Sequence, residues 1–200
     1  MSVVKTLFIL LMAFACGNSL VQGYTLNGEI RGVDNGWLFI RHRQTGQIDS
    51  CRIEHGQFKV SGVVNQPEFC SLGLSVNGLK DYYLSMFIEN GAFHVRLDKD
   101  SLNDISILYT GSVVEREFQY FQRQVSDINR QHYDAVEANK QLEQTAADFS
   151  LKHPKSYVSA FALNSYVHDV LKLAQFYALL DAKVQGSYFG VKVKERLKGQ

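Results

Sequence analysis

The amino-acid sequence predicts an α+β protein: an antiparallel β-sandwich or open barrel over residues 24–111, followed by a C-terminal helical region over residues 112–200. Two observations predict this fold class. Short runs with alternating apolar residues, separated by glycine-containing turns, fill the first half of the chain. Near Thr110 the spacing of apolar residues changes from the period of strands to the period of helices.

The first residues have the character of a secretory signal peptide, which we place at residues 1–23. Lys5 is the only charge before Glu29, and an apolar run from Leu7 to Ala15 follows it. Such a run is shorter than the roughly 20 residues that cross a bilayer. We therefore expect export to the periplasm or cell envelope.

Two processing routes fit this segment. Residues 21–23 offer a cleavage site before Tyr24, which is the route we favour. Alternatively, residues 13–16 form a loose lipoprotein motif without its usual leucine, so that Cys16 would be lipidated and the protein would be an outer-membrane lipoprotein. Only that second route predicts membrane contact.

The β-rich part is punctuated by turn sequences at residues 33–36, 54–57, 76–78 and 89–91. The runs between and beyond them predict strands at 25–30, 36–42, 48–54, 57–64, 68–74, 83–88, 92–97 and 105–109. If His55 and Gly56 form a two-residue hairpin loop, Ile53 faces Phe58 on the apolar side of the sheet.

Helical periodicity begins after Thr110. Ser112 and Glu115 have the spacing of a capping box, the usual start of a helix. We expect helices from there to Ile128, at 135–151, as one or two elements within 157–184, and at 188–197. Phe118, Phe121, Phe161 and Phe176 are predicted to be core residues.

Composition and motifs exclude some functions. The net charge of +1 falls to about zero once Lys5 is removed, so nucleic acid is not expected as a partner. No phosphate loop, dinucleotide fingerprint or nucleophile elbow is present, and the six histidines form no ligand pair. We predict no catalytic, cofactor-binding or metal-binding residue, and no cofactor.

Two cysteines remain after the signal region. Cys51 and Cys70 are expected to face the core from strands on either side of the strand that holds Val60. Two strand spacings make about 10 Å, too far for a disulfide. We therefore expect two buried free thiols that pack as small apolar side chains.

Tyrosines in the helical region are the candidates for a partner surface, because tyrosine combines an apolar ring with a polar tip. They are Tyr120, Tyr166, Tyr177 and Tyr188.

The order of several segments resembles a family of envelope domains of unknown function from anaerobic Gram-negative bacteria. The matching segments are residues 24–32, 48–50, 56–62, Pro67, 87–91 and 109–112. In that family the domain usually precedes a thioredoxin-like module with a Cys-x-x-Cys pair. No Cys-x-x-Cys is present here. A truncated relative of a longer protein, and a chain whose separate partner supplies the catalytic domain, both fit.

These observations predict a non-catalytic envelope binding or scaffold module. The alternative is an accessory component of a thiol–disulfide system that acts with a separate thioredoxin-like protein. An enzyme whose site is assembled only by folding ranks third.

Overall fold

The computed structural model describes residues 23–76, 79–98, 108–131 and 134–199. Residues 1–22 of the predicted signal segment, including Cys16, and most of the last predicted strand lie outside the described residues. Among the residues described, no helix is long and apolar enough to cross a membrane.

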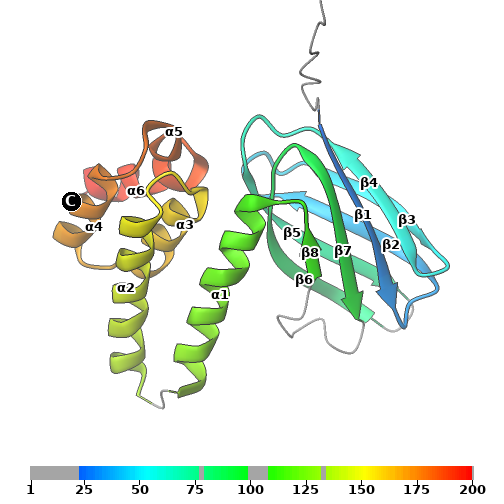
Figure 1. Cartoon of the computed structure of the whole chain (residues 1–200), viewed down its shortest axis with the longest axis horizontal. Coiled ribbons are helices and arrows are strands. Elements are labelled where there is room, and N and C mark those ends of the chain that lie inside the picture. The colour runs from blue at the N-terminus through cyan, green and yellow to red at the C-terminus, as the bar shows by residue number, and fades with distance from the viewer. Residues whose placement is uncertain (1–22, 77–78, 99–107, 132–133, 200) are drawn as a thin grey trace, which may run out of the picture.

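The described strands form one sheet of eight members (Figure 1). Its order is β6-β5-β2-β3-β4-β1-β7-β8. The strands are β1 (Tyr24–Arg31), β2 (Asn35–His42), β3 (Ile48–Glu54), β4 (Gln57–Gly62), β5 (Glu68–Val76), β6 (Leu79–Ile88), β7 (Gly91–Asp98) and β8 (Leu108–Thr110). The α+β class is confirmed. Of the two predicted β-architectures, sandwich and open barrel, the single curled sheet corresponds to the open barrel.

The β3–β4 hairpin has the predicted register, with Ile53 paired to Phe58. His55 and Gly56 both adopt positive φ, as a two-residue hairpin loop requires. One pairing differs from an all-antiparallel sheet, since β1 and β7 run parallel. They are far apart in the sequence, so no local turn signal could report their pairing.

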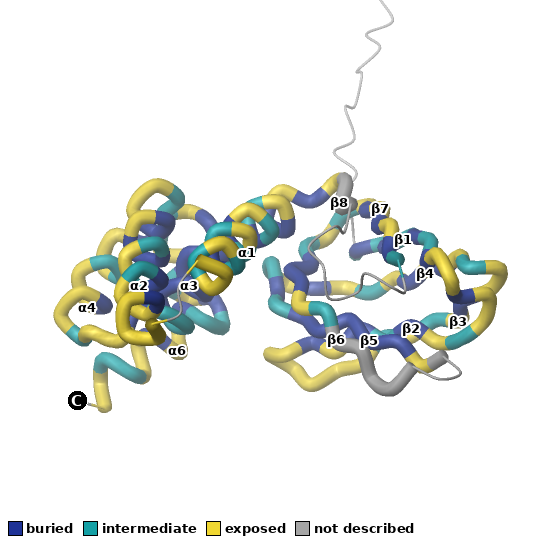
Figure 2. The backbone as a smooth tube through the Cα atoms, turned by 90° about the horizontal axis from the view of Figure 1, so that it is seen from below, coloured by how far each residue is buried: buried dark blue, intermediate teal, exposed yellow. Residues whose placement is uncertain are grey.

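Apolar side chains at alternate positions of the strands fill the interior of the barrel. Residues of even number on β1 and β2 point inward, and Leu26, Leu38 and Ile40 have no exposed surface. Figure 2 shows the buried positions along the inner side of the curled sheet, and edge strand β6 contacts helix α1. This inner cluster forms the first of two apolar cores.

Six helices follow the sheet in the described part of the chain. They are α1 (Val113–Gln131), α2 (Ala135–Lys152), α3 (Tyr157–Tyr166), α4 (Val170–Ala178), α5 (Ala182–Gln185) and α6 (Tyr188–Lys198). The capping residues Ser156, Asp169, Asp181 and Ser187 accept backbone N–H bonds at the starts of α3 to α6. Of the predicted core residues, Phe118, Phe121 and Phe161 are buried, whereas Phe176 is only partly buried.

Aromatic side chains join the sheet to the helices. Phe69 on β5 and Phe87 on β6 are paired across the outer face of the sheet, with ring centroids 5.4 Å apart. Phe118 of α1 lies 5.6 Å and 5.3 Å from these two rings, and Phe161 of α3 lies 5.1 Å from Phe69. Most of these contacts are edge-on, the favourable geometry for aromatic pairs. The second core is built around them.

Glu115 performs a different task from the one its spacing predicts. Ser112 Oγ accepts the Glu115 N–H at 3.0 Å, so half of the capping box forms. The Glu115 carboxylate does not complete the box but accepts the Phe87 N–H at 2.5 Å. That N–H belongs to an edge strand and needs a partner once α1 covers it. Glu89 occupies the helix N-terminus instead, where its Oε1 accepts the N–H groups of Val113 and Val114.

Burial raises the pKa of Glu115 to about 8, and the bonds from Gln119 and Phe87 only partly oppose it. Glu115 has no exposed surface. The folded protein therefore holds this proton more tightly than the unfolded chain does. The resulting stability is fully present below the ordinary carboxyl pKa of 4.5 and is lost as the pH rises toward 8.

Replacing Glu115 with Gln should remove this pH dependence. Between about pH 5 and pH 8, the free energy of unfolding of E115Q should gain on the wild type by up to about 1.4 kcal/mol per pH unit, and the difference should then level off. Gln keeps an acceptor for the Phe87 N–H, and Gln119 can turn its amide to match. Urea unfolding across this range measures the difference. Glu54→Gln, on an exposed side chain, is the control, and parallel pH profiles for E115Q and the wild type would contradict the account.

Candidate functional site

A polar cluster lies inside the barrel, at the end where β1 begins. It gathers Tyr24 from β1, His42 from β2, Asp49 from β3, and Glu68 and Cys70 from β5. Tyr24, His42 and Cys70 are each at most 2% exposed, and Glu68 is 8% exposed. Four strands thus contribute ionisable side chains to one largely sealed site.

His42 lies at the centre of this cluster between two carboxylates. Its Nε2 is 3.1 Å from Asp49 Oδ2 and its Nδ1 is 3.2 Å from Glu68 Oε2. Each ring nitrogen thus has a carboxyl oxygen as its partner, so no polar atom of the buried imidazole is left without a hydrogen-bond partner.

Hydrogen bonds hold the carboxylates in place. The Tyr24 hydroxyl donates to Asp49 Oδ2, and Gln47 Nε2 donates to Asp49 Oδ1 at 2.7 Å. Burial alone would raise the pKa of Asp49, but the bonds from Tyr24, Gln47 and His42 hold it below its ordinary value. Burial, followed by the bond to Asp49, raises the pKa of the Tyr24 hydroxyl far above its ordinary value. Glu68 Oε1 accepts the backbone N–H of Gln44 at 3.1 Å.

Cys70 contacts the same imidazole. Its Sγ is 3.5 Å from His42 Nδ1, so thiol, imidazole and Asp49 are connected in the manner of a thiol triad. Burial and then the nearby carboxylates raise the pKa of the Cys70 thiol, which opposes formation of the nucleophilic thiolate. With no exposed surface, this thiol presents no atom to a substrate in the conformation described. The geometry favours a structural role that ties four strands together.

Cys51 and Cys70 are both free thiols. Their strands flank β2, not the strand that holds Val60, so the neighbouring strand was predicted wrongly. Cys51 pairs with Leu38 and Cys70 with His42 on opposite edges of β2. Cys51 is half-buried, not fully buried as predicted, and burial raises its pKa as well.

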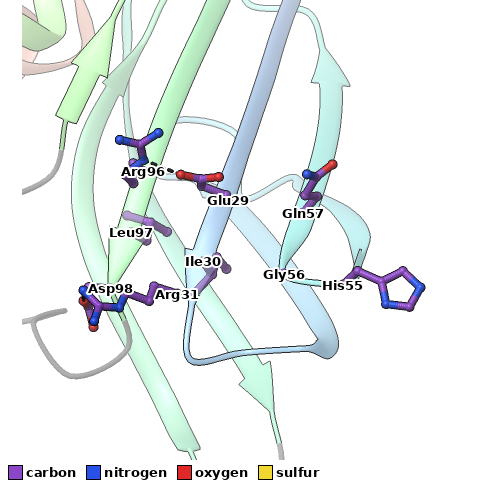
Figure 3. A pocket seen from close by; sticks show the side chains of 9 residues that line it. All are labelled: Glu29, Ile30, Arg31, His55, Gly56, Gln57, Arg96, Leu97 and Asp98. Carbon is purple, nitrogen blue, oxygen red and sulfur yellow. Dashed lines mark hydrogen bonds and ion pairs between the residues drawn. The ribbon is translucent and has the colours of Figure 1, made fainter.

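A cavity of about 510 Å³ opens at the other end of the barrel (Figure 3). Arg96 and Glu29 form an ion pair beside it, and Arg31 Nη1 lies 3.6 Å from Asp98 Oδ2. The side chains of Ile30 and Leu97 line the wall between these pairs. The charged groups satisfy one another there, and three of the four are well exposed, so the cavity offers little binding energy to a ligand.

The four candidate tyrosines lie in different environments. Tyr120 is 52% exposed on α1. Tyr166 packs against Phe121 with ring centroids 5.6 Å apart, and burial raises its pKa. The Tyr177 hydroxyl donates to the Gln185 carbonyl at 3.4 Å. Tyr188 is half-buried against Phe189 at 5.1 Å. The structure does not bring these four side chains together in any contact among the described residues.

The sequence reasoning missed the polar cluster, although a signal was present. His42 has the same parity as Leu38 and Ile40 on β2, and Asp49 has the same parity as Ile53 on β3. Alternation alone therefore assigns them to the interior. A histidine and a carboxylate that both occupy inward positions on neighbouring strands indicate a buried hydrogen-bonded pair.

Asp49→Ala should destabilise the protein, because it removes the shared acceptor of Tyr24 and His42. Each buried donor left without a partner costs about 1–3 kcal/mol. Asp49→Asn keeps an acceptor and should cost less at neutral pH. It should also remove the loss of stability that accompanies acidification through the lowered pKa of Asp49, below the ordinary value of 3.8. Urea unfolding between pH 2.5 and pH 7 measures both effects, with the exposed Asp127→Asn as control. Equal stability of Asp49→Ala and the wild type would contradict this role.

Comparison with known proteins concerns the strand-rich part. Residues 24–118 match the family model described as Domain of unknown function (DUF4369). No curated protein and no solved structure gives a significant match to the chain. The resemblance inferred from the sequence is thereby confirmed as far as a domain of unknown function, and no link to a thioredoxin-like module is shown. The barrel, together with the first turns of α1, is similar to this family.

Proposed function

We propose that the chain is a non-catalytic binding module of the bacterial cell envelope, and that helix α4 binds another envelope protein. The observation that carries the proposal is the exposure of this helix. Of its nine residues only Leu173 is buried, although the sequence VLKLAQFYA is mostly apolar. Leu171 is 83% exposed and Leu179, which caps the helix, is 50% exposed.

The preceding helix α3 differs from α4 in its burial. Residues 158–163 of α3 are all buried in the second core. Within residues 157–180, the apolar side chains that remain exposed are therefore mainly those of α4 and its cap. Both views place α4 at the end of the molecule remote from the sheet (Figures 1 and 2). Large exposed apolar patches mark interaction sites on proteins.

Charge indicates the chemistry of the partner. Residues 168–200 contain six Lys or Arg residues against three Asp or Glu residues. Lys172 on α4 is held by Glu143 at 2.7 Å and Lys192 on α6 by Glu195 at 2.9 Å, which leaves the basic excess on Lys183 of α5 and on the C-terminal turns of α6. An apolar patch with a basic surround is complementary to an apolar patch with an acidic rim. We therefore propose a folded protein partner with that surface.

The alternative function, in a thiol–disulfide system, would not involve the cysteines of this chain as reactive groups. The pKa of each thiol is raised by burial, so neither cysteine is poised as a nucleophile. A role in a thiol–disulfide system would thus consist of docking a separate thioredoxin-like protein, and α4 is the surface that we would assign to it.

Export is the part of the proposal that rests on Lys5 and the apolar run that follows it. N-terminal sequencing of protein recovered from the envelope should begin at Tyr24, whereas a chain lipidated at Cys16 would carry radiolabelled palmitate. Recovery of the intact chain from the cytosol would contradict export.

Site-specific crosslinking tests the docking proposal. A photo-crosslinking amino acid at Leu171 should give an adduct with one envelope protein in intact cells, and the same group at Val136 should not. Val136 is a matched control because it is 77% exposed on a different helix. With that partner purified, Leu171→Ser combined with Leu179→Ser should weaken binding at least tenfold and leave the melting temperature nearly unchanged.

Three outcomes would contradict the docking proposal. These are the absence of an adduct from Leu171, equal adducts from both positions, and an adduct of twice the chain's own mass. The last outcome would show self-association in place of a partner.

A further inference from the structure

The outer face of β2 presents two aromatic rings in line. Trp37 and Phe39 are stacked at 6.4 Å with their planes only 19° apart, and Trp37 is 43% exposed. Their neighbours on β5 are Ser75, which is exposed, and Gly73, which has no side chain. The rings thus form a nearly flat apolar strip on the surface of the sheet.

Two cations lie beside this strip. The Arg52 guanidinium is 5.6 Å from the centre of the Trp37 ring, and these two residues are paired across β2 and β3. The register of the β3–β4 hairpin, continued by one residue, sets Lys59 opposite Arg52 on the same outer face. In the part of the chain that the structure describes, neither Arg52 nor Lys59 has an ion-pair partner. Two neighbouring cations that form no ion pair favour an anionic ligand.

A groove connects these cations to the middle of the sheet. Its volume is about 610 Å³, and Asn27, Arg52, Lys59 and His94 line it. Asn27 is paired with Lys59 on one side and with His94 on the other, so these side chains form one row across three strands. The groove therefore brings cations, an amide and an imidazole together next to Trp37.

Acidic residues are confined to one end of the groove, at Glu29 and Glu54. Toward the other end, where β1 begins, the outward positions that the structure describes on β1 to β4 include no Asp or Glu. Hydroxyl groups occupy several of them, including Thr25 and Ser61, whose oxygens are 3.2 Å apart. Ser50 lies beside Phe39 in the same region.

We propose that this face binds an acidic saccharide. The C–H face of a sugar ring would stack on Trp37 and Phe39, because aromatic faces carry negative charge density that attracts C–H groups. Arg52 and Lys59 would bind the carboxylate, with Arg52 able to donate in a bidentate fashion. Asn27 and the hydroxyls supply the polar groups that orient a ligand in a pocket of this kind. The site is independent of the docking surface on α4.

A single-stranded nucleic acid combines stacking with negative charge too, but the surface fits it less well. Nucleic-acid grooves carry positive charge along several nucleotides. Here the cations are next to one aromatic pair, Glu29 and Glu54 close the groove at one end, and the whole chain has a net charge of only +1. A ligand with one or two acidic groups matches this distribution better.

Intrinsic fluorescence tests the proposal directly, since Trp37 is the only tryptophan in the chain. Tetragalacturonate, a hyaluronate hexasaccharide and sialyllactose are titrated into the purified protein, with maltotetraose as the neutral comparison. At least one acidic saccharide should change the Trp37 emission saturably and bind at least tenfold more tightly than maltotetraose. Lys59→Gln and Arg52→Gln should each weaken that binding at least tenfold, whereas Lys140→Gln on the exposed face of α2 should not. Calorimetry with Trp37→Ala and Phe39→Ala should show the same loss.

The proposal is overturned if none of the three acidic saccharides changes the emission at 10 mM. It is also overturned if Lys59→Gln and Arg52→Gln bind as the wild type does, or if an eight-nucleotide oligothymidine binds more tightly than every saccharide. Circular dichroism on each variant shows whether it is folded, and Lys59→Gln alone, on an exposed side chain, keeps the test decisive if another variant unfolds.

Discussion

The contact between Phe87 and α1 determines how the two halves of the molecule fit together. The Phe87 ring belongs to the aromatic cluster that fills the second core, and its N–H is accepted by the buried carboxylate of Glu115. An edge strand that exposes backbone donors would otherwise be open to pairing with another chain. When α1 covers that edge, the Phe87 N–H needs an acceptor inside an apolar interface. The Glu115 carboxyl is that acceptor, and its burial there raises its pKa. The helices are thereby fixed to the sheet by packing and by a backbone bond.

The two cores lie on opposite faces of the same sheet. Inward residues of β1 to β7 fill the barrel, whereas among the described residues Phe69 and Phe87, on the outer face of β5 and β6, belong to the second core with the helices. The barrel interior then has to accept the polar cluster around His42 at one end. That cluster is stable because each nitrogen of the imidazole meets a carboxylate oxygen and each carboxylate has a further donor. Among the described side chains, no buried polar atom lacks a partner.

Local patterns in the sequence were sufficient for most elements and for the β3–β4 register, but residues 157–185 form three helices, where one or two were predicted. Alternation, turn residues and capping residues all act within a few positions of one another, so they can be read without the fold. The parallel pairing of β1 with β7 and the placement of β2 beside β5 depend on contacts between distant segments. The same limit explains why Glu115 was interpreted as a capping residue: its acceptor role depends on Phe87, 28 positions earlier. His42 and Asp49 could have been found from parity, but the pairing of His42 with Glu68 could not.

Attachment of the helices to β5 and β6 also decides which surfaces stay free. The outer faces of β2, β3 and β4 are not covered by any described helix, which is why Trp37 remains 43% exposed beside Arg52. On the helical side, α3 lies against the aromatic cluster and is buried, while α4 lies beyond it and keeps Leu171 exposed. Both exposures therefore have one cause: the aromatic junction is small compared with the sheet and the helical layer that it joins. A polar ligand surface on the barrel and an apolar surface on the helices can coexist in one chain because this junction separates them.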